Sequence, residues 1–307
     1  MHRPFGQGGM QEGGMTIMKA VGQDLAEAQR IDASKTGTIQ SGADHPVIQV
    51  LSANKVFPNG TQALDAIDLS VQQGEFLSLI GPSGCGKSTL LKMIANLIEP
   101  TDGRILWWNG GPGRIGSDGA RLAFVFQDPT LMPWARVDAN VRLALDLERK
   151  GGNKSDTDVA ARIHAALDQV GLTKFARSYP RELSGGMRMR VSIARALIDQ
   201  PDLLLMDEPF GALDEFTRNK LDLDLVRLSW ERRLTTLFVT HSIYEAVFLS
   251  TRIIVMAANP GRIHSELVID EPQPRDEDFR GSPRFAQLCR DLSRMLTEAS
   301  NAGSPQS

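Results

Sequence analysis

One short segment of this 307-residue chain has the residue types and the spacing of a phosphate-binding loop. Residues 81–88 read GPSGCGKS and fit the pattern G-x-x-x-x-G-K-[ST] at every fixed position. A strand-like run precedes the segment and a helical run follows it, as this loop requires. Glycines let backbone N–H groups turn toward phosphate oxygens, and the start of a helix adds partial positive charge. The segment therefore predicts that the chain binds and hydrolyses ATP.

Individual residues of this loop have distinct expected roles. Lys87 would reach the β- and γ-phosphates, and the Ser88 hydroxyl would be a ligand of Mg²⁺. Cys85 is expected to be a small loop residue without chemistry of its own. The predicted nucleotide contacts are Gly81, Pro82, Ser83, Gly84, Cys85, Gly86, Lys87, Ser88 and Thr89.

Two carboxylates follow an apolar strand-like run at residues 203–206. In a parallel sheet the carboxyl ends of the strands face the ligand crevice. We expect Asp207 to hold the hydration shell of Mg²⁺ and Glu208 to polarise the attacking water as general base. The alternative is a strand that ends in solvated acids, and the phosphate loop makes this alternative the weaker one.

Three further features are weak alone and gain weight beside a phosphate loop. Residues 183–187 (LSGGM) precede a helical run, and a Ser-Gly-Gly helix start is either an ordinary cap or an anion-binding turn. Gln127 follows a predicted strand, where an amide can contact a metal ion or water, so it is a candidate Mg²⁺ ligand and site residue. His241 also follows a predicted strand, although a lone histidine is usually a packed or surface residue.

The elements that must position these residues alternate between strand and helix. Strands are predicted at residues 47–50, 75–80, 104–108, 122–126, 203–207, 236–240 and 252–256. Helices are predicted at residues 87–98, 137–148, 159–170 and 188–198. This alternation indicates an α/β fold with a mostly parallel sheet, and residues 128–182 indicate a helical subdomain inserted into its core.

The two ends of the chain differ from the predicted ATPase domain at residues 45–270. Residues 1–44 are rich in Gly, Gln, Ser and Met and lack apolar periodicity, which predicts a disordered extension. Residues 271–278 are acidic and contain proline, which favours a linker. A C-terminal helix and a short tail are expected beyond it, and the helix would dock another chain or, as we favour, pack on this chain's own core. Its apolar stripe is Phe285, Leu288, Cys289, Leu292, Met295 and Leu296.

Composition excludes several classes of protein. The net charge is −3 and the pI is near 6.0, without the basic surplus of a nucleic-acid binder. The two cysteines lie far apart in sequence and indicate a reducing compartment rather than a disulfide framework or a zinc site. No apolar run approaches the roughly 18 residues of a membrane span, and the start of the chain does not resemble a secretory signal. A role at a membrane would place the protein on its surface.

Taken together, the motifs resemble the nucleotide-binding subunits of ATP-binding cassette (ABC) transporters over about residues 46–270. The motifs are the phosphate loop, Gln127, residues 183–187, Asp207 with Glu208, residues 211–214 (GALD) and His241, in that order. A Ser-Gly-Gly signature between the phosphate loop and the acidic motif of Asp207 and Glu208 separates this family from other P-loop ATPases. The resemblance implies a P-loop NTPase core with an added antiparallel β region.

The resemblance also implies that two copies pair head to tail around two ATP molecules. Ser184, Gly185 and Gly186 of one copy would contact the γ-phosphate that the other copy holds. Asp214 would lie in the loop that joins the two sites. In a symmetric dimer of this kind, each chain needs to carry only half of each ATP site, because the other copy supplies the other half.

Further roles and two departures follow from the same resemblance. His241 would hold the γ-phosphate and the attacking water, Gln127 would link the site to the helical subdomain, and Phe57 would stack on adenine. Met187 stands where many members have glutamine, which removes one polar nucleotide contact. Ser242 stands where aspartate is frequent.

Longer segments are similar to the nitrate, sulfonate and taurine import group. These segments are residues 125–134, 179–188, 206–214 and 240–249. The similarity implies a bacterial importer with transmembrane permease subunits and a periplasmic or lipid-anchored solute-binding protein. The chain would then lie on the cytoplasmic face of the inner membrane as a peripheral subunit. The transported solute cannot be read from this chain, because the ATPase subunit never contacts it.

An exporter ATPase and a soluble ABC ATPase acting on DNA or ribosomes are the alternatives. Soluble relatives tend to carry coiled-coil or zinc inserts, or two cassettes in one chain, whereas the stretch between Gln127 and Ser184 has no cysteine and one helical region. The import-type segments argue against an exporter, although the permease mostly sets the direction. Trp134 either lines the groove that receives a permease helix or anchors its loop in the core, and the sequence leaves both open.

Overall fold

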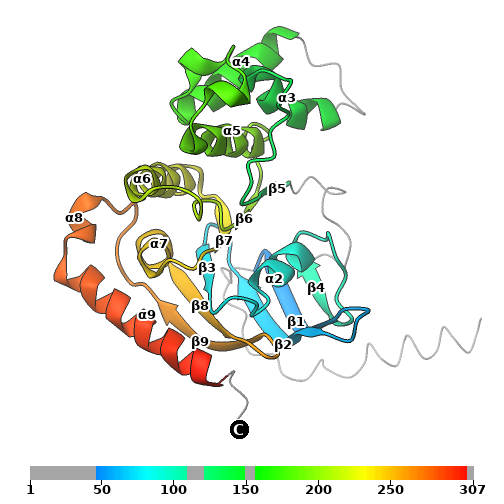
Figure 1. The fold of residues 1–307 in the computed structure, drawn as a ribbon, viewed down its shortest axis with the longest axis vertical. Helices are drawn as coiled ribbons and strands as arrows, with labels where there is room; N and C mark the ends of the chain where they lie inside the picture. Colours follow the sequence, from blue (N-terminus) through cyan, green and yellow to red (C-terminus); the bar gives the residue numbers. More distant parts are fainter. Residues whose placement is uncertain (1–45, 109–120, 149–155, 303–307) are drawn as a thin grey trace, which may run out of the picture. The chain divides into compact units, whose positions relative to one another are not determined.

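Two β-sheets form the centre of the part of the chain that the computed structural model describes (Figure 1). That part comprises residues 46–108, 121–148 and 156–302. The predicted extension at residues 1–44 and the tail beyond residue 302 lie outside it. Among the described helices, none has both the length and the apolar character needed to cross a membrane.

The larger sheet has six strands in the order β5-β6-β7-β3-β8-β9. In this order the strands span Leu122–Val125, Leu203–Asp207, Thr235–Val239, Phe76–Ile80, Arg252–Ala257 and Arg262–Val268. The first five are parallel and β9 is antiparallel to β8, which confirms a mostly parallel sheet. Both faces of this sheet are covered, so β6 carries apolar side chains on both faces. Leu203 and Leu205 belong to one hydrophobic cluster, and Leu204 and Met206 belong to the other.

The smaller sheet is antiparallel and has the order β2-β1-β4. Its strands span Gln62–Val71, Ile48–Val56 and Asp102–Trp107. The sequence analysis located only the start of β1 and did not locate β2 or β9. Alternate residues of β2 are buried, and its buried side chains share a hydrophobic cluster with the helix that follows the phosphate loop, α2 (Lys87–Ile94).

Helix α2 is shorter than the predicted helix at residues 87–98. Asn96 has a left-handed φ of 56°, and the Leu97 N–H donates to Lys92 O at 2.9 Å. This is the geometry of a Schellman C-terminal cap, in which asparagine replaces the more common glycine. The cap ends the helix and leaves the Leu97 side chain 57% exposed, so its apolar character misled the prediction.

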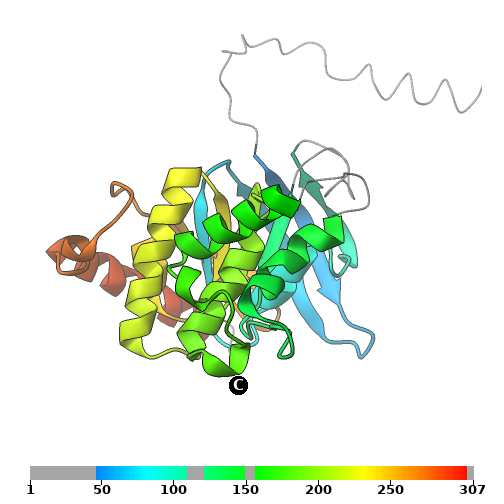
Figure 2. The same cartoon turned by 90° about the horizontal axis from the view of Figure 1, so that it is seen from above.

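Three helices pack against one another on one side of the larger sheet, as Figures 1 and 2 show. They are α3 (Val137–Glu148), α4 (Asp156–Gln169) and α5 (Gly185–Leu197), and the short 3-10 helices η1 (Thr173–Phe175) and η2 (Pro180–Glu182) connect α4 to α5. Helix α6 (Glu215–Arg232) contacts α5, and α7 (Ile243–Leu249) contacts α6 and β3. The helices α8 (Glu277–Arg280) and α9 (Pro283–Ala302) complete the described chain.

The C-terminal segments are anchored to the core. Helix α9 contacts α7, β8 and β9 and buries Phe285, Leu288 and Leu292 in the main hydrophobic cluster. Its apolar stripe therefore packs on this chain's own core, the alternative that the sequence favoured. The segment predicted as a linker contains the start of α8 and one buried charge, Arg275.

Arg275 attaches this segment to the end of α7. Its guanidinium donates to the backbone carbonyls of Val247 at 2.8 Å, Phe248 at 3.0 Å and Ser250 at 2.8 Å. Burial lowers the pKa of Arg275 to about 10, which leaves the side chain charged at neutral pH. The three bonds satisfy carbonyl groups that a helix end leaves without partners.

Arg275→Met should lower the free energy of unfolding by about 3 kcal/mol, because it removes buried bonds from a charged donor and keeps the aliphatic stem. The control is Arg284→Met, since Arg284 is half-exposed and pairs with Glu271 at 2.9 Å. This control should cost less than about 1 kcal/mol. Urea denaturation of both variants measures the difference, and equal losses would mean that Arg275 does not anchor the segment.

Candidate functional site

The phosphate loop leaves the end of β3 and begins α2, as its sequence pattern requires. Gly86 precedes the helix with a left-handed φ of 91°, and a Cβ there would lie 2.5 Å from the Leu64 side chain, so glycine is required on both counts. The Lys87 side chain is buried inside the loop, where its ammonium donates to Gly81 O at 3.0 Å and Pro82 O at 3.1 Å. A phosphate oxygen would replace these carbonyls as its partner.

Cys85 is a packing residue of the loop. It is fully buried, and burial raises the pKa of its thiol, while the Lys87 ammonium opposes this shift. Only the thiolate is an effective nucleophile, so a buried thiol with a raised pKa is unreactive. The structure thus supports a packing role for this cysteine.

Gly261, which the sequence analysis did not single out, supports the underside of the loop. A Cβ at this position would overlap with Cys85 O and would lie 2.6 Å from Ala63 O. The close approach lets Leu64 of β2 form a bridge with Gly261, and the Asp65 N–H donates to Gly261 O at 2.9 Å. In the sequence this residue reads as an ordinary turn glycine between two strands, so only the tertiary contact reveals its role.

Ser88 and Asp207 meet beside the loop. The Ser88 hydroxyl donates to Asp207 Oδ1 at 2.7 Å. Burial raises the pKa of the Asp207 carboxyl, and the hydrogen bond from Ser88 and the charges of Lys92 and Lys87 oppose the shift. A hydroxyl and a carboxylate oxygen at this separation fit Mg²⁺, which prefers oxygen ligands.

The protein alone does not enclose a metal ion at this point. Among the described residues, no three His, Cys, Asp or Glu side chains gather into a metal-binding group. A Mg²⁺ ion at Ser88 and Asp207 would therefore take its remaining ligands from phosphate oxygens, water or the predicted Gln127 amide.

Glu208, His241 and Gln127 converge at the same edge of the sheet. The strands that precede them, β6, β7 and β5, are neighbours in the larger sheet. His241 Nδ1 lies 3.5 Å from Glu208 Oε2. A Cβ at Gly211 would lie 3.5 Å from both Gln127 Nε2 and His241 Cε1, so both side chains approach this glycine. The Glu208 side chain is 27% exposed, so water can reach it.

The Ser-Gly-Gly turn and Asp214 lie together at the starts of two neighbouring helices. Ser184 caps α5, where its hydroxyl accepts a bond from Met187 N at 3.3 Å. Asp214 caps α6 by accepting from Thr217 N at 3.0 Å, and this bond lowers the pKa of Asp214. A Cβ at Gly186 would overlap with Thr217, so the two helix starts touch. None of the hydrogen bonds described for residues 184–186 reaches the phosphate loop of the same chain.

Three other residues singled out in the sequence have clear surroundings. Phe57 is half-buried, and Lys55 Nζ lies 5.6 Å from the centre of its ring. Ser242, the residue at the position where aspartate is frequent, caps α7 by accepting from Glu245 N at 3.3 Å. Met187 is partly buried against the main hydrophobic cluster. Adenine stacking by Phe57 remains a prediction.

The loop after Gln127 is braced from two helices. Arg195 of α5 donates to Pro129 O at 2.9 Å and to Thr130 O at 3.0 Å. The fully buried Asn140 of α3 accepts from Met132 N at 2.7 Å and donates to the carbonyls of residues 132, 135 and 136 at 3.1 Å each. Trp134 lies in this braced loop and is 77% exposed. The alternative in which Trp134 anchors the loop in the core is therefore wrong.

A buried polar chain, absent from the sequence analysis, joins the residue before His241 to the loop before Asp214. The Thr240 hydroxyl donates to Glu245 Oε2 and accepts from Ser242 N at 2.9 Å. Glu245 Oε1 lies 3.2 Å from Arg218 Nε, and Arg218 donates to Leu213 O at 2.9 Å. Burial raises the pKa of Glu245, opposed by the Thr240 bond and the Arg218 charge. These residues are spread over β7, α7 and α6, so sequence spacing does not connect them.

Comparison with known proteins agrees with this geometry. A family model described as ABC transporter matches residues 64–211. An uncharacterized ABC transporter ATP-binding protein of Methanocaldococcus jannaschii is 45% identical over 255 residues, which cover 82% of this chain and 91% of that protein. The aliphatic sulfonates import ATP-binding protein SsuB of Bacillus licheniformis is 44% identical, with 76% of this chain and 88% of that protein covered.

Solved structures have the same fold. An ATP-binding cassette dimer in a post-hydrolysis state, bound to ADP and Pi, has a TM-score of 0.65 and 33% identity, and covers 73% of this chain and 100% of that one. The cbiO1 protein of Clostridium perfringens, part of the ABC transporter complex cbiONQ, has a TM-score of 0.66 and 26% identity, with coverages of 81% and 99%. The extent of identity over most of both chains shows that this chain belongs to the ATP-binding proteins of ABC transporters and is an ABC ATPase.

Proposed function

We propose that this ABC ATPase energises a bacterial importer of aliphatic sulfonates or of a related small solute such as nitrate or taurine. The observation that carries the proposal is the 44% identity to an aliphatic sulfonates import protein over 88% of that protein. Two further aliphatic sulfonates import ATP-binding proteins, from Bacillus cereus strains, are 43% identical. The uncharacterized relative with 45% identity supports the family and says nothing of the solute.

The site residues take the following roles in hydrolysis. Ser88 and Asp207 would hold Mg²⁺, which would neutralise charge on the phosphates. Glu208 would accept a proton from the attacking water, and His241, whose Nδ1 lies 3.5 Å from Glu208 Oε2, would orient that water and the γ-phosphate. Gln127 approaches Gly211, as His241 does, and leads into the braced loop.

Two copies of the chain pair head to tail in this proposal. Residues 184–186 and Asp214 lie at the starts of α5 and α6, and none of the bonds described for residues 184–186 reaches the phosphate loop of the same chain. They would complete the site of the opposite copy, and the support for this pairing is that two ABC cassettes with the same fold were solved as dimers. Each chain thus supplies the phosphate-loop half of one ATP site and the Ser-Gly-Gly half of the other.

The complete transporter would add permease subunits and a solute-binding protein. The exposed Trp134 offers an apolar surface to a permease helix, and Arg195 and Asn140 hold its loop rigid enough to transmit force to Gln127. The chain would then work at the cytoplasmic face of the membrane. A net charge of −3 gives no support to a role on nucleic acid.

Glu208→Gln tests the assigned general base. Turnover should fall by about 10³-fold while ATP binding persists, because the amide keeps the shape of the side chain and cannot accept the proton. The control is Glu298→Gln on the exposed side of α9. Steady-state hydrolysis and the binding of a fluorescent ATP analogue are the measurements, and unimpaired turnover in Glu208→Gln would remove this residue from the mechanism.

Thr240→Val tests the buried polar chain. The change keeps the volume of the side chain and removes the hydroxyl that bonds Glu245 and the Ser242 N–H, so the backbone at His241 loses two constraints. We expect kcat to fall by about tenfold with nucleotide affinity unchanged. The matched control is Thr236→Val, a buried position at the start of the same strand whose hydroxyl bonds only Leu234 O. If both variants lose kcat equally, the chain has no special role.

Trp134→Ala tests the permease surface. Solute uptake by the assembled transporter should fall by about tenfold or more, and hydrolysis by the isolated subunit should stay within about twofold, since the side chain is exposed and lies outside the nucleotide site. Val268→Ala, at another exposed apolar side chain, on β9, is the control. Equal losses of uptake and basal hydrolysis, or no loss of either, would contradict the proposed surface.

A further inference from the structure

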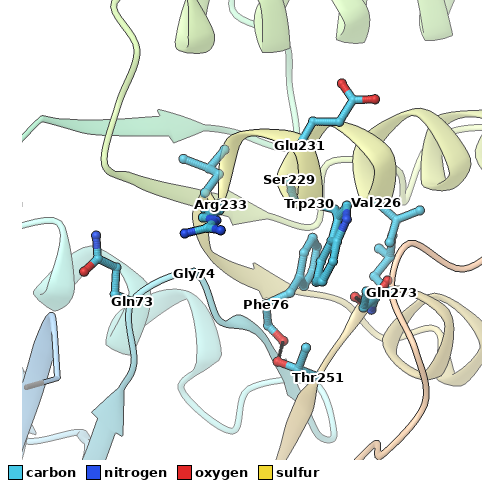
Figure 3. A pocket seen from close by; sticks show the side chains of 12 residues that line it. Gln73, Gly74, Phe76, Val226, Ser229, Trp230, Glu231, Arg233, Thr251 and Gln273 are labelled. Carbon is cyan, nitrogen blue, oxygen red and sulfur yellow. Dashed lines mark hydrogen bonds between the residues drawn. The ribbon is translucent and has the colours of Figure 1, made fainter. Parts of the chain in front are cut away.

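A cavity of about 800 Å³ lies at the amino-terminal ends of the parallel strands, whereas the phosphate loop lies at their carboxyl ends (Figure 3). Phe76 at the start of β3, Leu234 just before β7 and Thr251 just before β8 contribute to its lining. The nucleotide motifs follow the other ends of the parallel strands, about 16 Å away along a five-residue strand. The cavity is therefore separate from the nucleotide site, and its volume is typical of small-molecule sites.

One part of the lining is apolar and aromatic. Phe76, Val226, Leu234 and Leu249 are buried and contribute apolar side chains to the lining. The Trp230 indole, from the last turn of α6, is 56% exposed and stands beside Phe76 and Val226 in Figure 3. An exposed indole next to an apolar surface favours a ligand with a flat apolar body.

The same cavity is lined by a cation, Arg233, that has no ion pair within the part of the chain that the structure describes. Arg233 lines it, and none of the ion pairs or side-chain hydrogen bonds described for residues 46–108, 121–148 and 156–302 involves its guanidinium. Its backbone is held as the C-cap of α6, with φ 49° and a bond from its N–H to Trp230 O at 3.1 Å. In the view of Figure 3 the guanidinium lies between Gln73 and Trp230.

The other polar groups of the lining do not neutralise Arg233. Gln273 donates to Leu249 O at 3.1 Å and accepts from Arg275 N at 3.2 Å, and the Thr251 hydroxyl donates to Phe76 O at 3.1 Å. The Glu231 carboxylate points away from Arg233 in Figure 3, and its charge acts instead on Arg232. The buried Ser229 hydroxyl in the wall has no hydrogen-bond partner among the described residues.

The C-terminus of α6 opposes an anion in this cavity, but more weakly than Arg233 attracts one. A helix C-terminus carries roughly half a negative charge, spread over its last carbonyls. Two of these carbonyls already accept bonds, from Arg233 N to Trp230 O at 3.1 Å and from Leu234 N to Ser229 O at 2.9 Å. The full charge of Arg233 therefore determines the sign of the ligand.

From these features we propose that the cavity is a binding site for a small amphipathic organic anion. Its anionic group pairs with Arg233, and its apolar body lies against Trp230 and the neighbouring apolar wall. A neutral molecule of the same shape would leave Arg233 without a partner, and an organic cation would be repelled by it.

Isothermal titration of the full chain with naphthalenesulfonate, and with the neutral naphthalenesulfonamide, tests the proposal. The sulfonate should bind at one saturable site. Arg233→Gln should weaken its binding by about tenfold, which corresponds to about 1.4 kcal/mol for one charge-assisted contact. Trp230→Ala should also weaken it. Arg227→Gln, an exposed arginine of the same helix outside the cavity lining, is the control and should bind as the unchanged protein does.

The neutral sulfonamide should bind the unchanged protein more weakly than the sulfonate, and Arg233→Gln should not alter its affinity. Three results would each overturn the proposal: no saturable sulfonate binding at millimolar concentration, equal sulfonate affinity with and without Arg233, or equal losses in Arg233→Gln and Arg227→Gln. Both arginines are exposed, and circular dichroism checks that the variants keep their fold.

Discussion

The parallel pairing of β5, β6, β7 and β3 is the constraint on which the candidate site depends. Parallel strands in register end at one edge of a sheet, so the residues that follow them must share the same space. Asp207 pairs with Val239, which sets Glu208 and His241 side by side, and β3 delivers the phosphate loop next to them. For this reason Ser88 and Asp207, 119 positions apart in sequence, meet at 2.7 Å.

Arginine-to-carbonyl bonds hold loops at both ends of the parallel strands. Arg195 braces the loop after Gln127, Arg218 braces the loop before Asp214, and Arg275 fastens the C-terminal segment to α7. Loops cannot satisfy their carbonyls through regular ladders, and a guanidinium offers several donors in a fixed plane. Each bond therefore fixes an irregular segment relative to a helix that the sheet already positions.

The charges of the site are arranged for a nucleotide rather than for internal pairing. Burial raises the pKa of Asp207, and Lys87 lies buried against carbonyls instead of a carboxylate. A bound phosphate and cation would supply the missing opposite charge to Lys87 and to Asp207 respectively. On the opposite edge of the sheet, Arg233 is likewise a cation without a carboxylate partner among the described residues.

Local patterns in the sequence were sufficient for the phosphate loop, the acidic strand end at 207–208 and the buried parallel strands. The two motifs are recognised by residues at short spacing, and the buried strands are recognised by continuous apolar runs. Both kinds of pattern are visible in the sequence without a structure. β2 and β9 were not located, since half-exposed strands carry a weaker signal. The end of α2 was misplaced because an asparagine cap at residue 96 leaves Leu97 in solvent.

Tertiary structure alone decided how distant residues meet. The support from Gly261, the link from Thr240 through Glu245 and Arg218, the exposure of Trp134 and the cavity around Arg233 all depend on contacts between elements far apart in the chain. Spacing along a sequence carries no information about such contacts, because the crossovers between parallel strands set them. The sequence by itself therefore determined the chemistry at the phosphate loop, and the fold determined which residues surround it and what lies at the other edge of the sheet.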